Sequence, residues 1–315
     1  MKALGAVAAV LCTFFWSVAA GAAPVASAAT AGAPVAASPA APVVVDPWAE
    51  QPWDQRRALP NDSRPPKRRE PLHMLPPLPT DPAAVGMVRR VALPDGPKVA
   101  ALTFDLCELD TVTTGYNAAI INFLRAEKLP ATLFMGGKWM RTHAARVRQV
   151  LTEPLFEVGN HAWSHGNFAL LSPEGMRAQV LWTQAQYELL REDALAAARA
   201  VGGPQPSIPP VPVLFRLPYG RCSPQALEVA RRVRPGSILL FHANRVPHGS
   251  AALLRGVVAA LRAQGYSFVT VSRLLRMGEP RRTTDGYFTV PGDNHALDGR
   301  FGVDGTGRHT PFTGR

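Results

Sequence analysis

The stretch Val99-Ala100-Ala101-Leu102-Thr103-Phe104-Asp105 places an aspartate at the end of an apolar run. A run of this kind predicts a strand that is buried on both faces, as in parallel sheets. In α/β folds with parallel strands, the chemistry gathers at the carboxyl ends of the strands. We therefore expect Asp105 to lie at the rim of a functional pocket.

Three later stretches show the same arrangement, with a chemically active residue beside or after an apolar run. They are His161-Ala162-Trp163-Ser164-His165, Arg216-Leu217-Pro218-Tyr219-Gly220 and Leu239-Leu240-Phe241-His242. The carboxyl ends of parallel strands meet at one edge of a sheet. We expect one pocket to collect all four stretches.

Strand-like runs and helical patterns alternate through the middle of the chain. The expected strands cover 99–104, 131–135, 156–159, 213–215, 238–241 and 267–271, and the expected helices cover 116–127, 141–151, 172–200, 223–233 and 251–263. Ser172 supplies an N-cap for the longest helix, and Pro173 suits its first turn. Repeated βα units with right-handed crossovers predict an α/β fold with a parallel sheet, either open or closed into a barrel.

Composition divides the 315 residues into four parts. One basic residue, an apolar run and small residues predict a cleaved signal peptide over 1–22, with an uncleaved anchor as the alternative. Residues 23–90 are rich in Ala, Pro and Arg and predict a linker, whereas 91–278 predict the globular domain and 279–315 a Gly/Arg-rich tail. The apolar run is short for a stable membrane span, so we expect a periplasmic or secreted protein.

The formal net charge is +11, and Arg64-Pro65-Pro66-Lys67-Arg68-Arg69 is the densest basic patch of the linker. Such a patch could attract anionic lipid, polysaccharide or nucleic acid, or could simply be solvated. No aromatic residues alternate with the basic ones, as a surface that binds single strands requires. We therefore expect no nucleic-acid partner.

His161 and His165 are four residues apart. On a helical turn their imidazoles would face one side and could bind one metal ion. The chain has eight histidines, so the spacing alone is weak evidence, and structural histidines are the alternative. A preceding Gly159-Asn160 turn and the Ser164 hydroxyl favour a metal site, because both could support the ligands. We predict His161 and His165 as metal ligands.

Three further residues complete an acid–base site. Arg216 could keep Asp105 ionised, because a nearby positive charge lowers the pKa of a carboxyl group. Pro218-Tyr219-Gly220 predicts a turn whose backbone N–H groups could face a developing oxyanion. His242 could protonate a leaving amine. The set predicts hydrolytic chemistry.

In type and order, the four stretches resemble the motifs of the polysaccharide deacetylases of the NodB-homology family, carbohydrate esterase family four. The resemblance covers about 99–275 and implies a distorted (β/α) barrel with a divalent metal ion, often zinc. It implies these roles: Asp105 as general base, His161 and His165 as metal ligands, Arg216 as the partner that orients the base, Tyr219 as an oxyanion contributor through its N–H, and His242 as general acid.

The resemblance implies a metal-dependent hydrolase that removes acetyl groups from an N-acetylated polysaccharide. Peptidoglycan, a chitin-like polymer and an exopolysaccharide are candidate substrates, and an O-acetylated polysaccharide is a variant. An acetamide carbonyl resists attack, so a metal ion is needed to polarise it and to lower the pKa of the attacking water. Trp139 or Trp163 could stack on the sugar, with core packing as the alternative.

Leu106 departs from the family pattern, which has a second aspartate there as the third metal ligand. Glu108, Asp110 and Cys107 are candidate replacements, and Asp105 itself could bind the metal. We favour Glu108. Catalytic zinc sites generally use three protein ligands, so loss of the third would weaken metal binding.

The segment between Tyr219 and His242 is a second departure. It holds one predicted helix, whereas the family has a further strand and helix there, and a βα unit needs at least a dozen connecting residues. We therefore predict a barrel that lacks one βα unit before His242. Together with Leu106, this motivates an alternative: a catalytically impaired glycan-binding or cell-wall-associated protein of the same fold.

Cys107 and Cys222 each follow one of the motifs. Export to an oxidising compartment favours a disulfide between them, and two free thiols are the equal alternative. A bond from Cys107 to a metal ion would exclude the disulfide.

Overall fold

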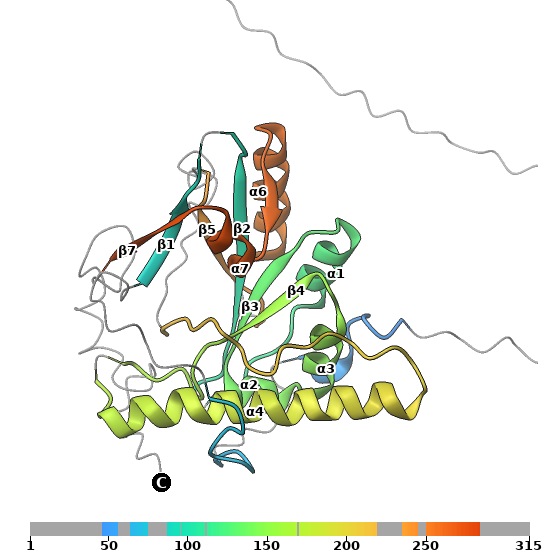
Figure 1. The fold of residues 1–315 in the computed structure, drawn as a ribbon. Coiled ribbons are helices and arrows are strands. Elements are labelled where there is room, and N and C mark those ends of the chain that lie inside the picture. The colour runs from blue at the N-terminus through green and yellow to red at the C-terminus, as the bar shows by residue number, and fades with distance from the viewer. Residues whose placement is uncertain are drawn as a thin grey trace, which may run out of the picture. The chain divides into compact units, whose positions relative to one another are not determined.

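The strand β2 (Val99–Leu106) lies inside the sheet that carries the predicted motifs (Figure 1). β3 (Ala131–Met135) and then β4 (Phe156–Asn160) follow on one side of it, and β5 (Ile238–His242) pairs on the other. β6 (Ser267–Val269) pairs with the first residues of β2. All these pairs are parallel, so the predicted α/β fold with a parallel sheet is confirmed.

The computed structural model describes eight ranges of the chain. They are 46–55, 64–74, 87–94, 96–110, 112–168, 170–218, 235–244 and 250–283. The predicted signal peptide, the predicted helix 223–233, Tyr219, Cys222 and the tail beyond 283 lie outside them. No helix among the described residues has the length and apolar character needed to cross a bilayer.

The predicted barrel is not confirmed. Within the described ranges the strand order is β4-β3-β2-β5, with β6 attached to β2, and this order does not close on itself. The expected strand 213–215 is reduced to a bridge between Phe215 and Asn160 at the end of β4. That bridge still brings Arg216 to the sheet, because its N–H donates to the Asn160 carbonyl at 2.9 Å. The absence of a βα unit before His242 stays a prediction.

The side chains of β2 alternate between two surroundings, as the pleat of a strand requires. Ala100, Leu102, Phe104 and Leu106 belong to the large hydrophobic core. Val99 and Ala101 belong to a smaller cluster with residues of β6 and α7 (Val271–Met277). Further along this second face the side chains turn polar, so the strand itself leads from a hydrophobic cluster to the candidate site.

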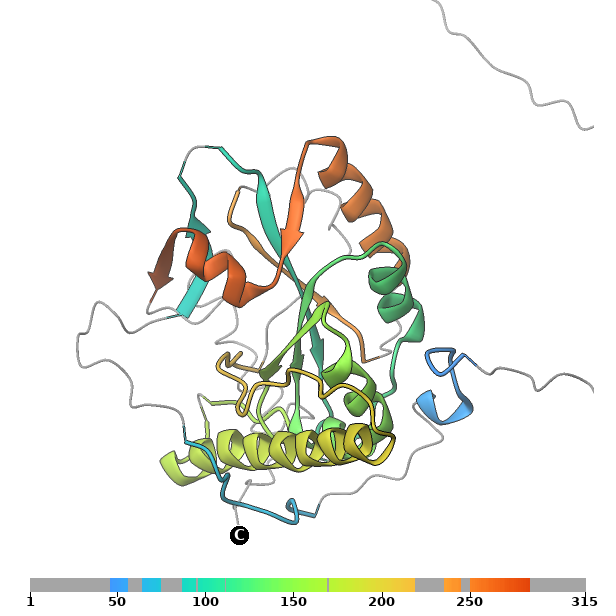
Figure 2. The same cartoon turned by 45° about the vertical axis from the view of Figure 1, so that its right-hand side comes forward.

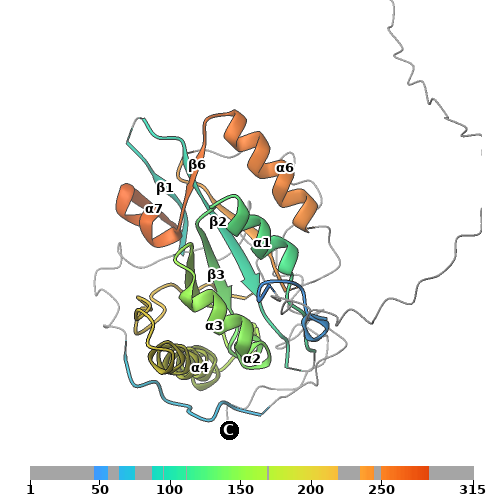
Figure 3. The same ribbon diagram turned by 90° about the vertical axis from the view of Figure 1, so that its right-hand side faces the viewer.

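Helices cover the face of the sheet that holds the large core (Figure 3). Apolar residues of α1 (Ala118–Ala126), α3 (Ala144–Thr152) and α6 (Ser250–Ala263) all contribute to that core. The prediction of one helix over 141–151 is wrong in detail, since His143 separates α2 (Gly137–Thr142) from α3. The imidazole of His143 stacks on Trp139 and lies 2.9 Å from the Thr114 carbonyl, so tertiary contacts fix this break.

The longest helix, α4 (Pro173–Ala200), begins where the sequence predicts. The Ser172 hydroxyl accepts a hydrogen bond from the N–H of Gly175, which satisfies one of the free N–H groups of the first turn. Figure 2 shows α4 running past α2 and α3, near the carboxyl ends of the strands, and α4 contacts both helices. Its first half therefore lies beside the predicted histidine motif.

Two parts of the chain that we expected to be a linker and a tail form structure. β1 (Met87–Ala92) and β7 (Glu279–Thr283) make a separate antiparallel pair. The segment 46–55 is tied to α3 by a buried salt bridge of 2.5 Å between Asp54 and Arg146. These contacts depend on residues far apart in the sequence, so local composition does not indicate them.

Candidate active site

Asp105 lies on the polar side of β2, paired with Arg216. Nη1 of Arg216 donates to Oδ1 of Asp105 at 2.7 Å, and Nη2 donates to the Thr103 hydroxyl at 2.7 Å. That hydroxyl in turn donates to the Leu239 carbonyl of β5 at 2.7 Å. The guanidinium also stacks on the ring of Phe134, 4.0 Å from its centroid. Three strands therefore fix the position of the Asp105–Arg216 pair.

The Asp105 carboxyl is only 1 % exposed, yet its pKa is lowered. Burial alone would raise the pKa, because it disfavours the charged form. The charge of Arg216 opposes this most strongly, the charge that His161 or His242 carries when protonated adds to it, and so does the hydrogen bond from Arg216. Asp105 is therefore a carboxylate, as we expected from the placement of Arg216.

His161 faces Asp105 through its unprotonated nitrogen. Nδ1 lies 2.9 Å from the Arg216 carbonyl, and a carbonyl only accepts, so Nδ1 carries the proton. Burial is the main cause that lowers the pKa of His161, which favours the neutral ring. Nε2 is buried without a hydrogen bond, 3.4 Å from Oδ2 of Asp105. A lone pair and a carboxylate oxygen face each other there, an arrangement suited to a cation between them.

The prediction that His161 and His165 share a helical turn is wrong. They lie in a loop after β4, and Ala162 and His165 have φ angles of 64° and 57°. These left-handed conformations bring the two rings within 4.9 Å, centroid to centroid, and nearly perpendicular. Burial and the neighbouring His161 lower the pKa of His165 well below its ordinary value, so both rings are neutral donors.

Two side chains hold this loop in place. Oδ1 of Asn160 accepts from the Ala162 N–H at 2.9 Å. Gln179 of α4 accepts from the Ser164 N–H and donates to the Ser164 hydroxyl, both at 2.9 Å. The sequence singled out Asn160 and Ser164, but Gln179 has no local signal because its role depends on how α4 packs.

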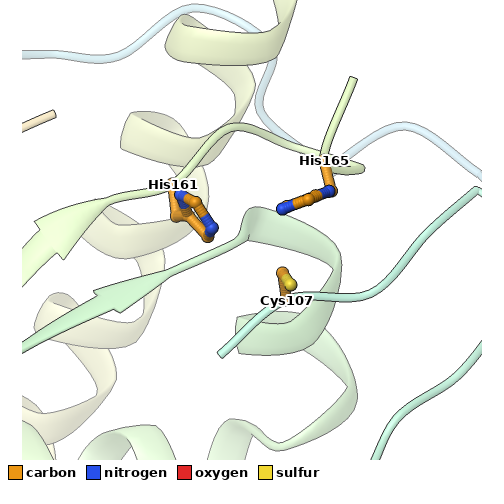
Figure 4. Close-up of side chains that lie close together, drawn as sticks. All are labelled: Cys107, His161 and His165. Atoms are coloured by element: carbon orange, nitrogen blue, oxygen red, sulfur yellow. The ribbon is translucent and has the colours of Figure 1, made fainter. Parts of the chain in front are cut away.

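Cys107 joins the two histidines (Figure 4). Its Sγ and one ring nitrogen each of His161 and His165 lie within 4.8 Å of one another, and no other described residue belongs to this group. Two neutral imidazoles and a sulfur form a donor set that zinc binds in proteins. The described residues therefore fit a metal ion.

Glu108, our expected third ligand, is engaged elsewhere. Its Oε1 accepts from the Thr114 N–H at 3.2 Å, and its Oε2 accepts from the Thr142 hydroxyl at 2.9 Å. Cys107 is a buried free cysteine, and its pairing with Cys222 stays a prediction because Cys222 lies outside the described residues. Residue type alone did not decide between these candidates, because the chain leaves the strand at this point.

The remaining predicted residues have three different outcomes. His242 ends β5 and is opposite Asp105 in the strand register, so both lie at the same level of the sheet. Tyr219 lies outside the described residues. Trp139 and Trp163 are fully buried, so the structure favours their role in the core over stacking on a sugar.

Comparisons with known proteins find similarity to polysaccharide deacetylases. Residues 92–234 match the family model described as polysaccharide deacetylase. The chain is 29 % identical over 217 residues to a peptidoglycan-N-acetylglucosamine deacetylase of Bacillus cereus, covering 58 % of this chain and 91 % of the relative. It is 26 % identical over 230 residues to the deacetylase PgdA of Listeria monocytogenes, covering 63 % of this chain and 44 % of PgdA.

A solved structure, the peptidoglycan deacetylase PdaC from Bacillus subtilis, is also similar. It shares 26 % sequence identity and a TM-score of 0.42, with 57 % of this chain and 91 % of PdaC covered. The family match ends before β5, so it does not include His242.

Proposed function

Because residues 92–234 match the polysaccharide deacetylase family model, we propose that the chain is a metal-dependent hydrolase that removes acetyl groups from an N-acetylated polysaccharide. Peptidoglycan is the substrate we favour, since two relatives are named peptidoglycan deacetylases. The observation that carries the proposal is the buried Asp105 carboxylate, held by Arg216 and facing the bare Nε2 of His161.

In this proposal Asp105 is the general base. Its carboxylate accepts the proton of the attacking water, a role that requires an ionised oxygen held in one position. Arg216 and Thr103 provide that position through their hydrogen bonds. His242, level with Asp105 across the sheet, donates a proton to the departing sugar amine. The N–H of Tyr219 would stabilise the oxyanion.

His161 and His165 would hold the divalent ion, for which we propose zinc. Such an ion supplies Lewis acidity: it polarises the acetyl carbonyl and lowers the pKa of water. The hydrogen bond from Nδ1 of His161 to the Arg216 carbonyl fixes the ring so that Nε2 presents its lone pair. We further propose that residues 1–22 direct export, so that the enzyme meets its glycan in the periplasm or outside the cell.

Acetate release tests the proposal. Purified protein supplied with zinc, cobalt or manganese should release acetate from peptidoglycan or chito-oligosaccharides, and an acetylated xylan tests the ester variant. Asp105→Asn should lower the rate roughly 10²- to 10⁴-fold, because it removes the base. Asp193→Asn is the matched control, since that carboxylate is 62 % exposed on α4. If none of these glycans yields acetate, the proposal fails.

A second candidate function is a glycan-binding protein of this fold with impaired catalysis. Leu106 motivates it, because this residue is fully buried in the hydrophobic core where the family has its third ligand. This candidate predicts that peptidoglycan binding, measured by co-sedimentation, survives His161→Ala. Metal-dependent acetate release by the unmodified protein would exclude it.

A further inference from the structure

The end of β2 determines which side chain can reach the two histidines. Leu106 points into the hydrophobic core and is fully buried there, whereas Asp105 lies on the opposite face. Cys107 follows the last residue of β2, and its side chain lies toward the two histidines. A ligand at position 106 would face the core, so a third ligand has to come from another position, such as 105 or 107.

Cys107 has the geometry of a ligand. Its Sγ and the two imidazole nitrogens lie within 4.8 Å of one another, and the side chain projects toward both rings (Figure 4). Ligand atoms around a tetrahedral zinc ion are roughly 3.5 Å apart, given a Zn–S distance of about 2.3 Å and a Zn–N distance of about 2.0 Å. Small side-chain rotations that move these ligand atoms by up to roughly 1 Å would bring all three to bonding distance of one ion.

The backbone of Cys107 is fixed from two directions. Its carbonyl accepts from the Thr114 hydroxyl at 2.7 Å and from Nδ2 of Asn244 at 3.1 Å. Nδ2 of Asn244 also lies 3.6 Å from Sγ, the kind of contact by which an outer-shell donor stabilises a metal-bound thiolate. At Gly136 an added Cβ would lie 3.2 Å from the Ala162 carbonyl and 3.4 Å from Cα of Cys107. A glycine thus lets the cysteine and the histidine loop pack closely together.

We propose that Cys107 is the third protein ligand of the metal centre, giving this chain a Cys-His-His set in place of one that contains a carboxylate. The inference rests on the proposed function and deepens it. The thiol binds as thiolate and releases its proton to solvent, so the set keeps the single negative charge that an aspartate would contribute. Sulfur favours zinc or cobalt over magnesium.

The test uses cobalt in the full-length protein, because a cobalt–thiolate bond gives a near-ultraviolet charge-transfer absorption that nitrogen and oxygen ligands do not. The unmodified protein should show this band. Cys107→Ser and Cys107→Asp should both lose it, and Cys222→Ser, the matched cysteine control, should keep it. Circular dichroism checks that each variant is folded, and the aspartate variant provides a second test if the serine variant is not.

Zinc affinity, measured by competition with a chromophoric chelator, gives the second readout. Cys107→Ser should lower it on the order of 100-fold, and Cys107→Asp should recover part of the loss. Glu108→Gln should leave it unchanged. A cobalt complex without the band, or a loss of affinity in Glu108→Gln but not in Cys107→Ser, would overturn the inference.

The outcomes also separate this inference from the proposed function. A band without acetate release supports the Cys107 ligand and contradicts the deacetylase. Acetate release that needs His161 but proceeds normally in Cys107→Ser, without a band in the unmodified protein, supports the deacetylase and contradicts the Cys107 ligand. Failure of the protein to bind either zinc or cobalt contradicts both.

Discussion

The two faces of β2 are equally buried but are stabilised in different ways. On one face Leu102, Phe104 and Leu106 belong to the hydrophobic core, where the area removed from water provides the stability. On the other face Thr103 and Asp105 are just as enclosed, but each makes short hydrogen bonds to named partners. A single strand thus provides both the core of the fold and the floor of the site.

This contrast shows that the face of the strand on which a side chain lies determines its role, even when two residues are adjacent in the sequence. Leu106 and Asp105 are adjacent, yet a shift by one residue moves a side chain to the other face of the sheet. Substitutions on the core face should therefore change the free energy of unfolding and spare the site chemistry. Substitutions on the polar face should change the site chemistry as well as the hydrogen bonds that stabilise it.

Leu106→Asp should break this pattern most severely. It restores the residue type of the family at this position, but the carboxylate would enter the hydrophobic core without a partner. An unpaired buried charge costs several kcal/mol, and breaking buried pairs costs about 3–5 kcal/mol, a large part of a typical protein's stability. We expect largely unfolded protein by circular dichroism, with no gain in zinc affinity. Leu106→Met, which keeps the volume, is the control.

A folded Leu106→Asp variant that binds zinc more tightly would show that the side chain at position 106 can turn from the hydrophobic core to the site. It would then also weaken the assignment of Cys107 as ligand. The zinc titration of this variant therefore tests both the orientation of residue 106 and the assignment of Cys107 as ligand.

Phe104→Ala should have the next largest effect, confined to stability. The Phe104 ring stacks on Phe241 of β5, with centroids 5.4 Å apart, and truncation leaves a cavity between two strands. Losses of this kind are about 3–5 kcal/mol. Urea unfolding should show the loss, whereas the zinc affinity of the folded variant should be within about twofold of the unmodified protein's. A loss of affinity without a loss of stability would contradict the division between the faces.

Thr103→Val should have a moderate effect that falls mainly on activity. The substitution keeps the shape but removes the hydroxyl, so Nη2 of Arg216 loses an acceptor and the Leu239 carbonyl loses a donor. Unpaired buried polar groups cost about 1–3 kcal/mol. Arg216 is then less well fixed, and kcat for acetate release should fall more than KM changes. Thr103→Ser keeps the hydroxyl and should retain most of the stability and most of kcat. Equal effects of the serine and valine substitutions would show that packing alone is involved.

The sequence predicted the parts of the site that depend on strands. Asp105 and Arg216 each follow an apolar run, and parallel strands bring such positions together, so their ion pair was foreseeable. The same reasoning located β3, β4 and β5 to within a residue or two at their ends. The burial of strand residues follows a short repeat along the chain, so the apolar runs of the sequence predict it.

The parts that the sequence did not predict depend on backbone paths outside regular elements. Nothing in the pattern shows that Cys107 turns toward the histidines while Glu108 turns toward Thr114 and Thr142. The left-handed residues of the histidine loop were equally hidden, because alanine and histidine seldom adopt that conformation. Tertiary hydrogen bonds hold these paths, and their partners lie on other elements.

Ala162→Gly should have the smallest effect and tests whether the histidine loop, which borders the polar face of β2, stores backbone strain. Ala162 has a φ of 64°, which costs an L-residue roughly 1–2 kcal/mol, and glycine removes that cost. The unfolded chain gains freedom worth about 0.4–1 kcal/mol, and a buried methyl group worth about 0.8 kcal/mol is lost. These terms nearly cancel, so the unfolding free energy should change by less than about 1 kcal/mol.

Ala131→Gly in β3 is the matched control, because Ala131 is also fully buried but is not among the described residues with a positive φ. It loses the same methyl group and gains the same freedom without relief of strain, so it should lose about 1–2 kcal/mol. Urea unfolding of both variants measures the difference. Equal losses would mean that the loop at Ala162 stores no backbone strain.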